Sequence, residues 1–189
     1  MHPEDTRTLV FLGHTALYRG DYETANDFQA RALKVDPASI WPNLFFPIVR
    51  LYQGRPAEAL ERLRVARQMF PEETTLVSVE GSIAAHEGDF KRAEQLADEA
   101  LKNPRTMLHI HHLWHNVAAV FAMCGKPEKA VHWLRRCAEM GLPNYLLFGS
   151  DPHLRALHNR PEFLELMGVL RQEHVQYCEE FGTAGVARF

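Results

Sequence analysis

A six-residue motif that recurs four times at nearly constant spacing constrains the fold of this chain more than any other feature. The motif reads GDYETA, GRPAEA, GDFKRA and GKPEKA, and it begins at Gly20, Gly54, Gly88 and Gly125, so the intervals are 34, 34 and 37 residues. Seven residues after each motif stands another small residue, at Ala32, Ala66, Ala100 and Cys137. Repeats of this length are supersecondary units that bury their apolar faces by stacking on one another. The 189 residues are therefore predicted to form one repeat array.

Hydrophobic spacing on both sides of the motif glycines predicts helices. Before Gly20, apolar residues recur at three- and four-residue intervals, and the same spacing follows it, at Leu9, Leu12, Ala16 and then Ala25, Phe28, Ala32 and Leu33. No segment alternates with period two, and no Asn-Gly or Asp-Gly dipeptide marks a β-hairpin. The predicted fold class is all-α.

The period, the turn glycine, the two small positions and the exit prolines Pro37, Pro71 and Pro104 together resemble the tetratricopeptide repeat. The resemblance implies a right-handed superhelix of about four helix-turn-helix units, over residues 5–38, 39–72, 73–104 and 105–140. Because a stack leaves its last apolar face bare, residues 141–182 are expected to form an extension with a C-terminal capping helix. Gly182 is expected to end that helix, and residues 183–189 to form a frayed tail.

Two features depart from the repeat pattern. Pro47 falls inside the first helix of the second unit, where a missing hydrogen bond should kink the helix or delay its start. Three extra residues, at positions 103–108, precede the fourth motif and should lengthen the connection into that unit or the helix that follows.

The chain from His111 onward carries a second resemblance, to the C-terminal tetratricopeptide region of bacterial Ser/Thr protein kinases and related multidomain signalling proteins. It rests on Ala130, Trp133, Leu134, Gly141, Pro143, Tyr145, Asp151, Pro152, Leu154, Leu157, Pro161 and Phe163. This resemblance implies a docking or regulatory module of a bacterial signalling protein, with the parent kinase or signalling domain itself as one possible partner.

Composition excludes several classes of partner and compartment. Lys and Arg number 21 against 24 Asp and Glu, so the formal charge of −3 offers no basic surplus for nucleic acid. There is no apolar run of membrane-spanning length and no signal peptide at the start, so no membrane partner is expected. The cysteines Cys124, Cys137 and Cys178 are odd in number and form no CxxC pair, which favours the reducing cytoplasm.

The sequence predicts no catalysis and no cofactor. It contains no glycine-rich kinase loop, no HRD, no DFG and no GxSxG elbow, and no serine stands in a nucleophile signature. Cys124 lies near a helix end and Cys137 at a small packing position, which are typical of core residues.

Eleven histidines raise the alternative of a metal site. His111 and His115 are four residues apart and would share one helix face, with His112 beside them and His86 or His132 as a third ligand from a neighbouring helix. Two ligands are too few to hold a metal ion. The HxxxH pair also lacks the glutamate that zinc proteases have between their two histidines. We therefore predict no metal, with histidine-based metal binding as the alternative.

In tetratricopeptide proteins the first helices of successive units line a concave groove, and stacking aligns equivalent residues along it. The corresponding positions here are rich in aromatic residues and histidines, a composition enriched at binding surfaces. The predicted partner-binding groove consists of Phe11, His14, Tyr18, Trp41, Phe45, Ile48, Tyr52, His86, His112, His115, Asn116 and Met123.

The chemistry of these positions restricts the partner. Tetratricopeptide domains that bind chaperone C-termini use a basic and asparagine clamp, whereas the matching positions here are Val10, His14, Phe45, Thr75 and Val79. A free carboxylate would lie unpaired against apolar side chains. The predicted function is a protein–protein interaction scaffold for a peptide with apolar anchors or a partner domain. The alternative within this class is homo-oligomerisation with a second copy of the chain.

Overall fold

The computed structural model describes residues 5–181, and all regular secondary structure in this range is helical. Four antiparallel helix pairs follow one another: α1 Thr6–Tyr18 with α2 Tyr22–Val35, α3 Ile40–Tyr52 with α4 Pro56–Met69, α5 Thr74–His86 with α6 Phe90–Lys102, and α7 Ile110–Met123 with α8 Pro127–Glu139. The extension consists of α9 Tyr145–Ser150, the 3-10 helix η1 Pro152–Leu157 and α10 Pro161–Phe181. The predicted all-α fold is confirmed. The expectations for Gly182 and residues 183–189 lie outside the described residues.

The motif glycines form the turns within the pairs. Gly20, Gly54, Gly88 and Gly125 have φ angles of 77°, 71°, 82° and 69°, a left-handed conformation in which a Cβ atom would be strained. The second helix then starts in one of two ways. Asp21 and Asp89 cap it by accepting a hydrogen bond from the backbone N–H three residues later, at 3.1 and 3.0 Å, whereas α4 and α8 begin with Pro56 and Pro127.

The small residues of the repeat lie where the helices approach. The four motif alanines and the four later small residues are completely buried: Ala25, Ala32, Ala59, Ala66, Ala93, Ala100, Ala130 and Cys137. A larger side chain at these positions would push neighbouring backbones apart. The periodicity of the sequence thus corresponds to the helix contacts of the structure.

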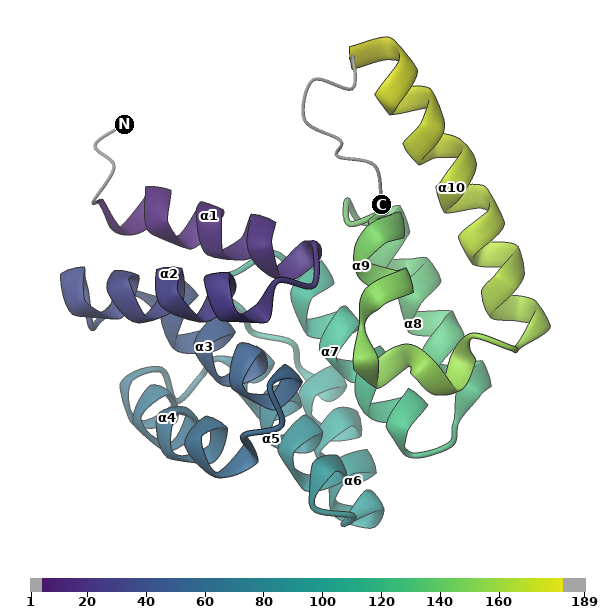
Figure 1. The fold of residues 1–189 in the computed structure, drawn as a ribbon. Coiled ribbons are helices and arrows are strands. Elements are labelled where there is room, and N and C mark those ends of the chain that lie inside the picture. The colour runs from purple at the N-terminus through teal and green to yellow at the C-terminus, as the bar shows by residue number, and fades with distance from the viewer. Residues whose placement is uncertain (1–4, 182–189) are drawn as a thin grey trace.

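Stacking of the pairs produces a curved array with two layers of helices (Figure 1). The inner layer contains α1, α3, α5 and α7, and the outer layer contains α2, α4, α6 and α8. The extension turns back after α8, so that α9 contacts α1, η1 packs against α7, and α10 packs against α8 and α9. The start of the inner layer is thereby joined to the C-terminal part of the chain.

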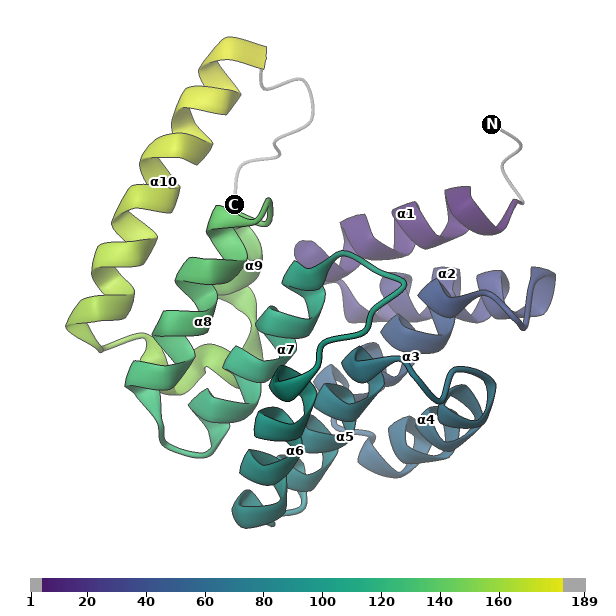
Figure 2. The ribbon, with the colours of Figure 1, turned by 180° about the vertical axis from the view of Figure 1, so that it is seen from behind.

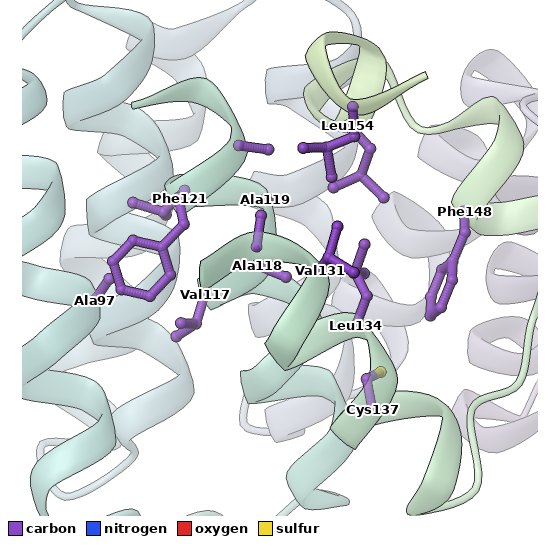
Figure 3. Close-up of a cluster of buried hydrophobic side chains, with 14 of the residues drawn as sticks. Ala97, Val117, Ala118, Ala119, Phe121, Val131, Leu134, Cys137, Phe148 and Leu154 are labelled. Carbon is purple, nitrogen blue, oxygen red and sulfur yellow. The ribbon is translucent and has the colours of Figure 1, made fainter. Parts of the chain in front are cut away.

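The largest hydrophobic cluster includes the extension. Figure 3 shows Phe121 of α7 and Leu134 of α8 in the same buried cluster as Phe148 of α9 and Leu154 of η1. All four side chains are fully buried. Phe163, Leu166 and Leu170 of α10 belong to the same cluster. The extension is therefore an integral part of the hydrophobic core.

Both departures from the repeat are accommodated locally. Of the two predicted effects of Pro47, a kink or a late start, the late start is not observed, because α3 begins at Ile40 and continues through Pro47. Pro42 occupies the third position of that helix, where a missing N–H is tolerated. The extra residues before the fourth unit lie in the connection 103–109, which runs past the start of α3 before entering α7 (Figure 2). This path brings His109 to 6.1 Å from Trp41, between ring centroids.

Candidate functional site

The twelve residues predicted to line the groove differ widely in accessibility. The side chains of His14, Phe45, Ile48, His112, His115 and Asn116 are buried. Half-buried positions are Tyr18, Trp41, Tyr52 and Met123, and exposed positions are Phe11 and His86. The inner face therefore divides into a part that other segments cover and a part that is open to a ligand.

The chain's own extension covers the C-terminal part of the inner face. Tyr52 donates a hydrogen bond of 2.8 Å from its hydroxyl to Oδ2 of Asp151, and Nε2 of His115 lies 3.1 Å from the same oxygen. The Nε2 atoms of His86 and His153 are 2.8 Å apart, so one imidazole donates to the other. Side chains from α3, α5 and α7 thus all contact the segment that begins η1.

Asp151 is an acidic residue with only 1% of its surface exposed. Its Oδ1 accepts the backbone N–H of His153 at 2.8 Å and caps η1. Burial by itself would raise the pKa of this carboxyl group, but the contacts with His115, His153 and Tyr52 together hold the pKa below its ordinary value. The carboxylate is therefore charged and fully engaged in holding the extension.

Little space remains beside this network. The cavity between Tyr18, Phe45, Ile48 and the extension residues Leu142 and Leu147 has a volume of only about 20 Å³. His115 stacks on Phe148 at 5.7 Å between ring centroids. Because these extension residues belong to the hydrophobic core, a partner cannot reach this part of the face in the described conformation. Met123 also packs against that core.

The N-terminal part of the inner face is open and forms a cleft of about 480 Å³. We call it the N-terminal cleft; its lining residues are Thr6, Arg7, Val10, Phe11, His14, Asp36, Ser39, Trp41 and His109. It lies between α1, the loop before α3, and the residue that precedes α7. Three predicted groove residues, Phe11, His14 and Trp41, meet here. Phe11 is 60% exposed, so an apolar surface is available to a ligand.

An aromatic cluster forms the inner end of this cleft. The ring of His14 lies 3.9 Å from Phe45 and 6.3 Å from His112, between centroids. Burial lowers the pKa of His14 to about 3 and, together with the neighbouring histidines, the pKa of His112 to about 2. Both imidazoles are therefore neutral at physiological pH and act as aromatic packing groups.

Two polar groups of the cleft lack the partners that their positions would suggest. Ser39 stands at the N-cap of α3 but makes no capping hydrogen bond, and the third helical residue, Pro42, has no N–H to donate. His14 Nε2 is buried without a hydrogen-bond partner in the described part of the chain. The Nε2 atom itself is shielded from solvent by the surrounding rings, so it is not presented to the cleft.

The histidines of the alternative metal-site hypothesis make separate contacts. His111 Nδ1 lies 3.1 Å from the carbonyl of Met140, His115 faces Asp151, and His112 packs in the aromatic cluster. Within residues 5–181, no three His, Cys, Asp or Glu side chains are arranged to hold an ion. In the same range, no helix is both long enough and apolar enough to cross a bilayer.

Sequence reasoning missed the network around Asp151 and several residues of the N-terminal cleft. The Asp151-Pro152 pair is a local signal for a helix start, since aspartate favours the N-cap and proline the first helical position. No local pattern shows that Asp151 would contact Tyr52, 99 residues away in sequence. Arg7 and Asp36 come together because α1 and α2 are antiparallel, and the connection 103–109 brings His109 to the same cleft.

Comparisons with known proteins agree with the arrangement of the helix pairs. A tetratricopeptide repeat family model matches residues 48–106. Pseudomonas aeruginosa pilF aligns with a TM-score of 0.50 and 18% identity over 90% of this chain and 75% of its own. The fold is a tetratricopeptide superhelix. The structure of the APC/C hetero-tetramer Cut9–Hcn1 aligns with a TM-score of 0.56 and 15% identity, over 89% of this chain and 36% of the other.

Yeast Tom70 aligns with a TM-score of 0.52 and 14% identity, over 93% of this chain and 41% of Tom70. The chain thus spans less than half of these two larger structures. No curated protein matches it by sequence. Tetratricopeptide repeat proteins are generally non-catalytic scaffolds for protein–protein interaction.

Proposed function

We propose that this chain is a protein-binding scaffold that takes up a segment of a partner in the N-terminal cleft. The observation that carries the proposal is the open cleft of about 480 Å³ at the N-terminal end of an inner face, next to a region that the extension covers. Its walls combine the aromatic side chains of Phe11 and Trp41 with a polar rim that includes Arg7 and Asp36. Apolar anchors inside a polar rim are the usual anatomy of a protein interface.

We also propose that the scaffold is a docking module of a bacterial signalling protein and acts in the cytoplasm. The residue pattern from Ala130 to Phe163 supports the first point, because it resembles the corresponding region of bacterial Ser/Thr kinases. The three unpaired cysteines support the second point, because a reducing compartment preserves free thiols. The adjoining reading frames of the source genome provide the test: a kinase or signalling domain in the same operon or reading frame is expected, and a purely metabolic context would contradict the assignment.

Peptide selection tests the binding function directly. The full chain is immobilised, peptides are selected from a random phage-displayed library, and the affinity of the enriched sequences is measured by fluorescence polarisation. We expect Phe11→Ser to weaken the binding of the selected peptides at least tenfold, since truncation of a central aromatic anchor commonly costs about 2 kcal/mol.

The matched control is Phe90→Ser. Phe90 is also an exposed phenylalanine, but it lies at the start of α6 in the outer layer. Selected peptides should bind this variant as tightly as the parent. Equal binding to the parent and to Phe11→Ser would remove the N-terminal cleft from the proposal.

A further inference from the structure

The second half of α10 continues an apolar stripe whose first half is buried. The first half belongs to the largest hydrophobic cluster and ends at Leu170. Beyond that residue the same three- and four-residue spacing continues through His174, Tyr177 and Phe181. Tyr177 is 55% exposed and Phe181 is 74% exposed. Figures 1 and 2 both show the C-terminal end of α10 extending past α9. An accessible apolar surface of this kind marks an interaction site.

The spacing of this stripe suits a second copy of the same helix. The stripe positions 170, 174, 177 and 181 are separated by four, three and four residues, so the intervals read the same in both directions. In an antiparallel pair, Phe181 of one copy would lie opposite Leu170 of the other, and Tyr177 opposite His174. This arrangement places the two bodies at opposite ends of an overlap of about 18 Å. In a parallel pair, α8 and α9 of both copies would compete for the same space.

A pocket lies near the point that the end of the second copy's α10 would reach. It has a volume of about 320 Å³ and is lined by Tyr18, Arg19, Tyr145, Leu146, Gly149 and Ser150. Tyr145 also contacts His174 of α10, at 5.7 Å between ring centroids. The pocket therefore adjoins the place where the buried half of the stripe ends. Its aromatic and apolar walls can receive the ring of an incoming Phe181.

The charges at the two contact surfaces are opposite. Glu179 and Glu180 are exposed and directly precede Phe181, and Arg19 is an exposed residue of the pocket wall. None of these three side chains forms an ion pair within the part of the chain that the structure describes. An acidic helix end that arrives beside an unpaired arginine is electrostatically complementary to it. The stripe, the pocket and the charges together specify a second copy of this chain as the occupant.

We propose that two copies of this chain associate through their α10 helices, which lie antiparallel along the exposed stripes. Phe181 of each copy enters the pocket of the other, and Glu180 faces Arg19. The association is isologous, so each contact is made twice. It uses no lining residue of the N-terminal cleft, and its outcome is therefore independent of the proposed peptide-binding function.

Sedimentation velocity of the full chain over a range of about 1 to 500 µM tests the association, with a reductant present to keep Cys178 as a free thiol. We expect a monomer–dimer equilibrium with a Kd on the order of 10 to 100 µM, since the overlap is smaller than a standard protein interface. Phe181→Ser should weaken the dimer at least tenfold, because it removes the aromatic anchor. A parent chain that stays monomeric over the whole range would overturn the proposal.

The matched control is Leu164→Ser. Leu164 lies on the same helix and is 56% exposed, but it stands outside the overlap. This variant should dimerise like the parent. A dimer that persists unchanged in Phe181→Ser would overturn the proposal in favour of a different face.

A charge exchange tests the register of the two copies. Arg19→Glu should weaken the dimer roughly three- to tenfold, because it places a carboxylate opposite Glu180. The double variant Arg19→Glu with Glu180→Arg has the net charge of the parent and should restore most of the affinity. Absence of this rescue would overturn the placement of the α10 end in the pocket.

An equal mixture of ¹³C-labelled and unlabelled chain identifies the occupant directly. Isotope-filtered NOE spectra should show contacts between the Phe181 ring of one copy and the Tyr145 ring of the other. Contacts of the stripe with residues 182–189 of the same chain, and none between copies, would overturn the proposal in favour of an intramolecular cover.

Discussion

Groups from several parts of the chain stabilise the charged carboxylate of Asp151. The Tyr52 hydroxyl and the His153 backbone N–H donate to it, and His115 lies beside it. We expect Tyr52→Phe to lower the free energy of unfolding by about 2 kcal/mol, because it removes a hydrogen bond to a buried charge. Urea denaturation followed by circular dichroism measures the loss. Tyr177→Phe removes a hydroxyl from a tyrosine that is 55% exposed and should change stability by less than about 0.5 kcal/mol.

The motif alanine of the second unit offers no room for a larger side chain. Ala59 is fully buried on α4, so Ala59→Leu should lower the free energy of unfolding by about 1 to 3 kcal/mol through overpacking. The neighbouring Ala57 lies on the same helix but is exposed, and Ala57→Leu should be nearly neutral. Thermal melts of the two variants provide the comparison. Equal melting temperatures would mean that the buried position is not tightly packed.

At the scale of the elements, two glycines should respond to alanine in opposite directions. Gly54 has a φ angle of 71°, and its replacement should cost about 1 kcal/mol, although nothing lies within 4 Å of the added Cβ. Gly168 lies inside α10 with equally open surroundings, and Gly168→Ala should add about 1 kcal/mol, because alanine favours helix. Urea midpoints of both variants test the pair. A stabilising Gly54→Ala would contradict the turn geometry.

The elements differ in how far the sequence predicts them. The repeat predicts the pairs from α1 to α8 because its turn glycines, caps and small alanines are local signals that recur. The extension is different: its amphipathic pattern indicates a cap, but its packing into the inner face depends on contacts such as Tyr22 to the carbonyl of Ser150, 128 residues apart. Sequence periodicity contains no information on such contacts. For this reason half of the twelve predicted groove residues are buried, and the N-terminal cleft includes residues that the predicted groove did not contain.

For the molecule as a whole, buried histidines make stability depend on pH. Burial lowers the pKa of His14, His112 and His153 to about 3, 2 and 4, below the value of about 6.5 in the unfolded chain. As the pH falls below 6.5 the unfolded state therefore binds protons that the native state does not, and stability decreases. Between pH 7 and pH 5, each of these three histidines should lower the free energy of unfolding by about 2 kcal/mol.

Urea denaturation at the two pH values measures this dependence. His112→Phe should reduce the loss by about 2 kcal/mol, since the proton-binding difference of this imidazole is removed. His132→Gln is the control at an exposed position and should leave the loss unchanged. A chain as stable at pH 5 as at pH 7 would contradict the burial of these imidazoles.

The return of the extension across the inner face changes how the array should come apart. Helical repeat arrays with contacts only between neighbours unfold in steps, and their terminal repeats fray first. Here Tyr22 of α2, Tyr52 of α3 and His86 of α5 are each hydrogen-bonded to residues 150–153, so the first, second and third pairs are fastened to the same short segment. When force is applied to the two ends of the chain, it should therefore unfold in one cooperative event and not one helix pair at a time.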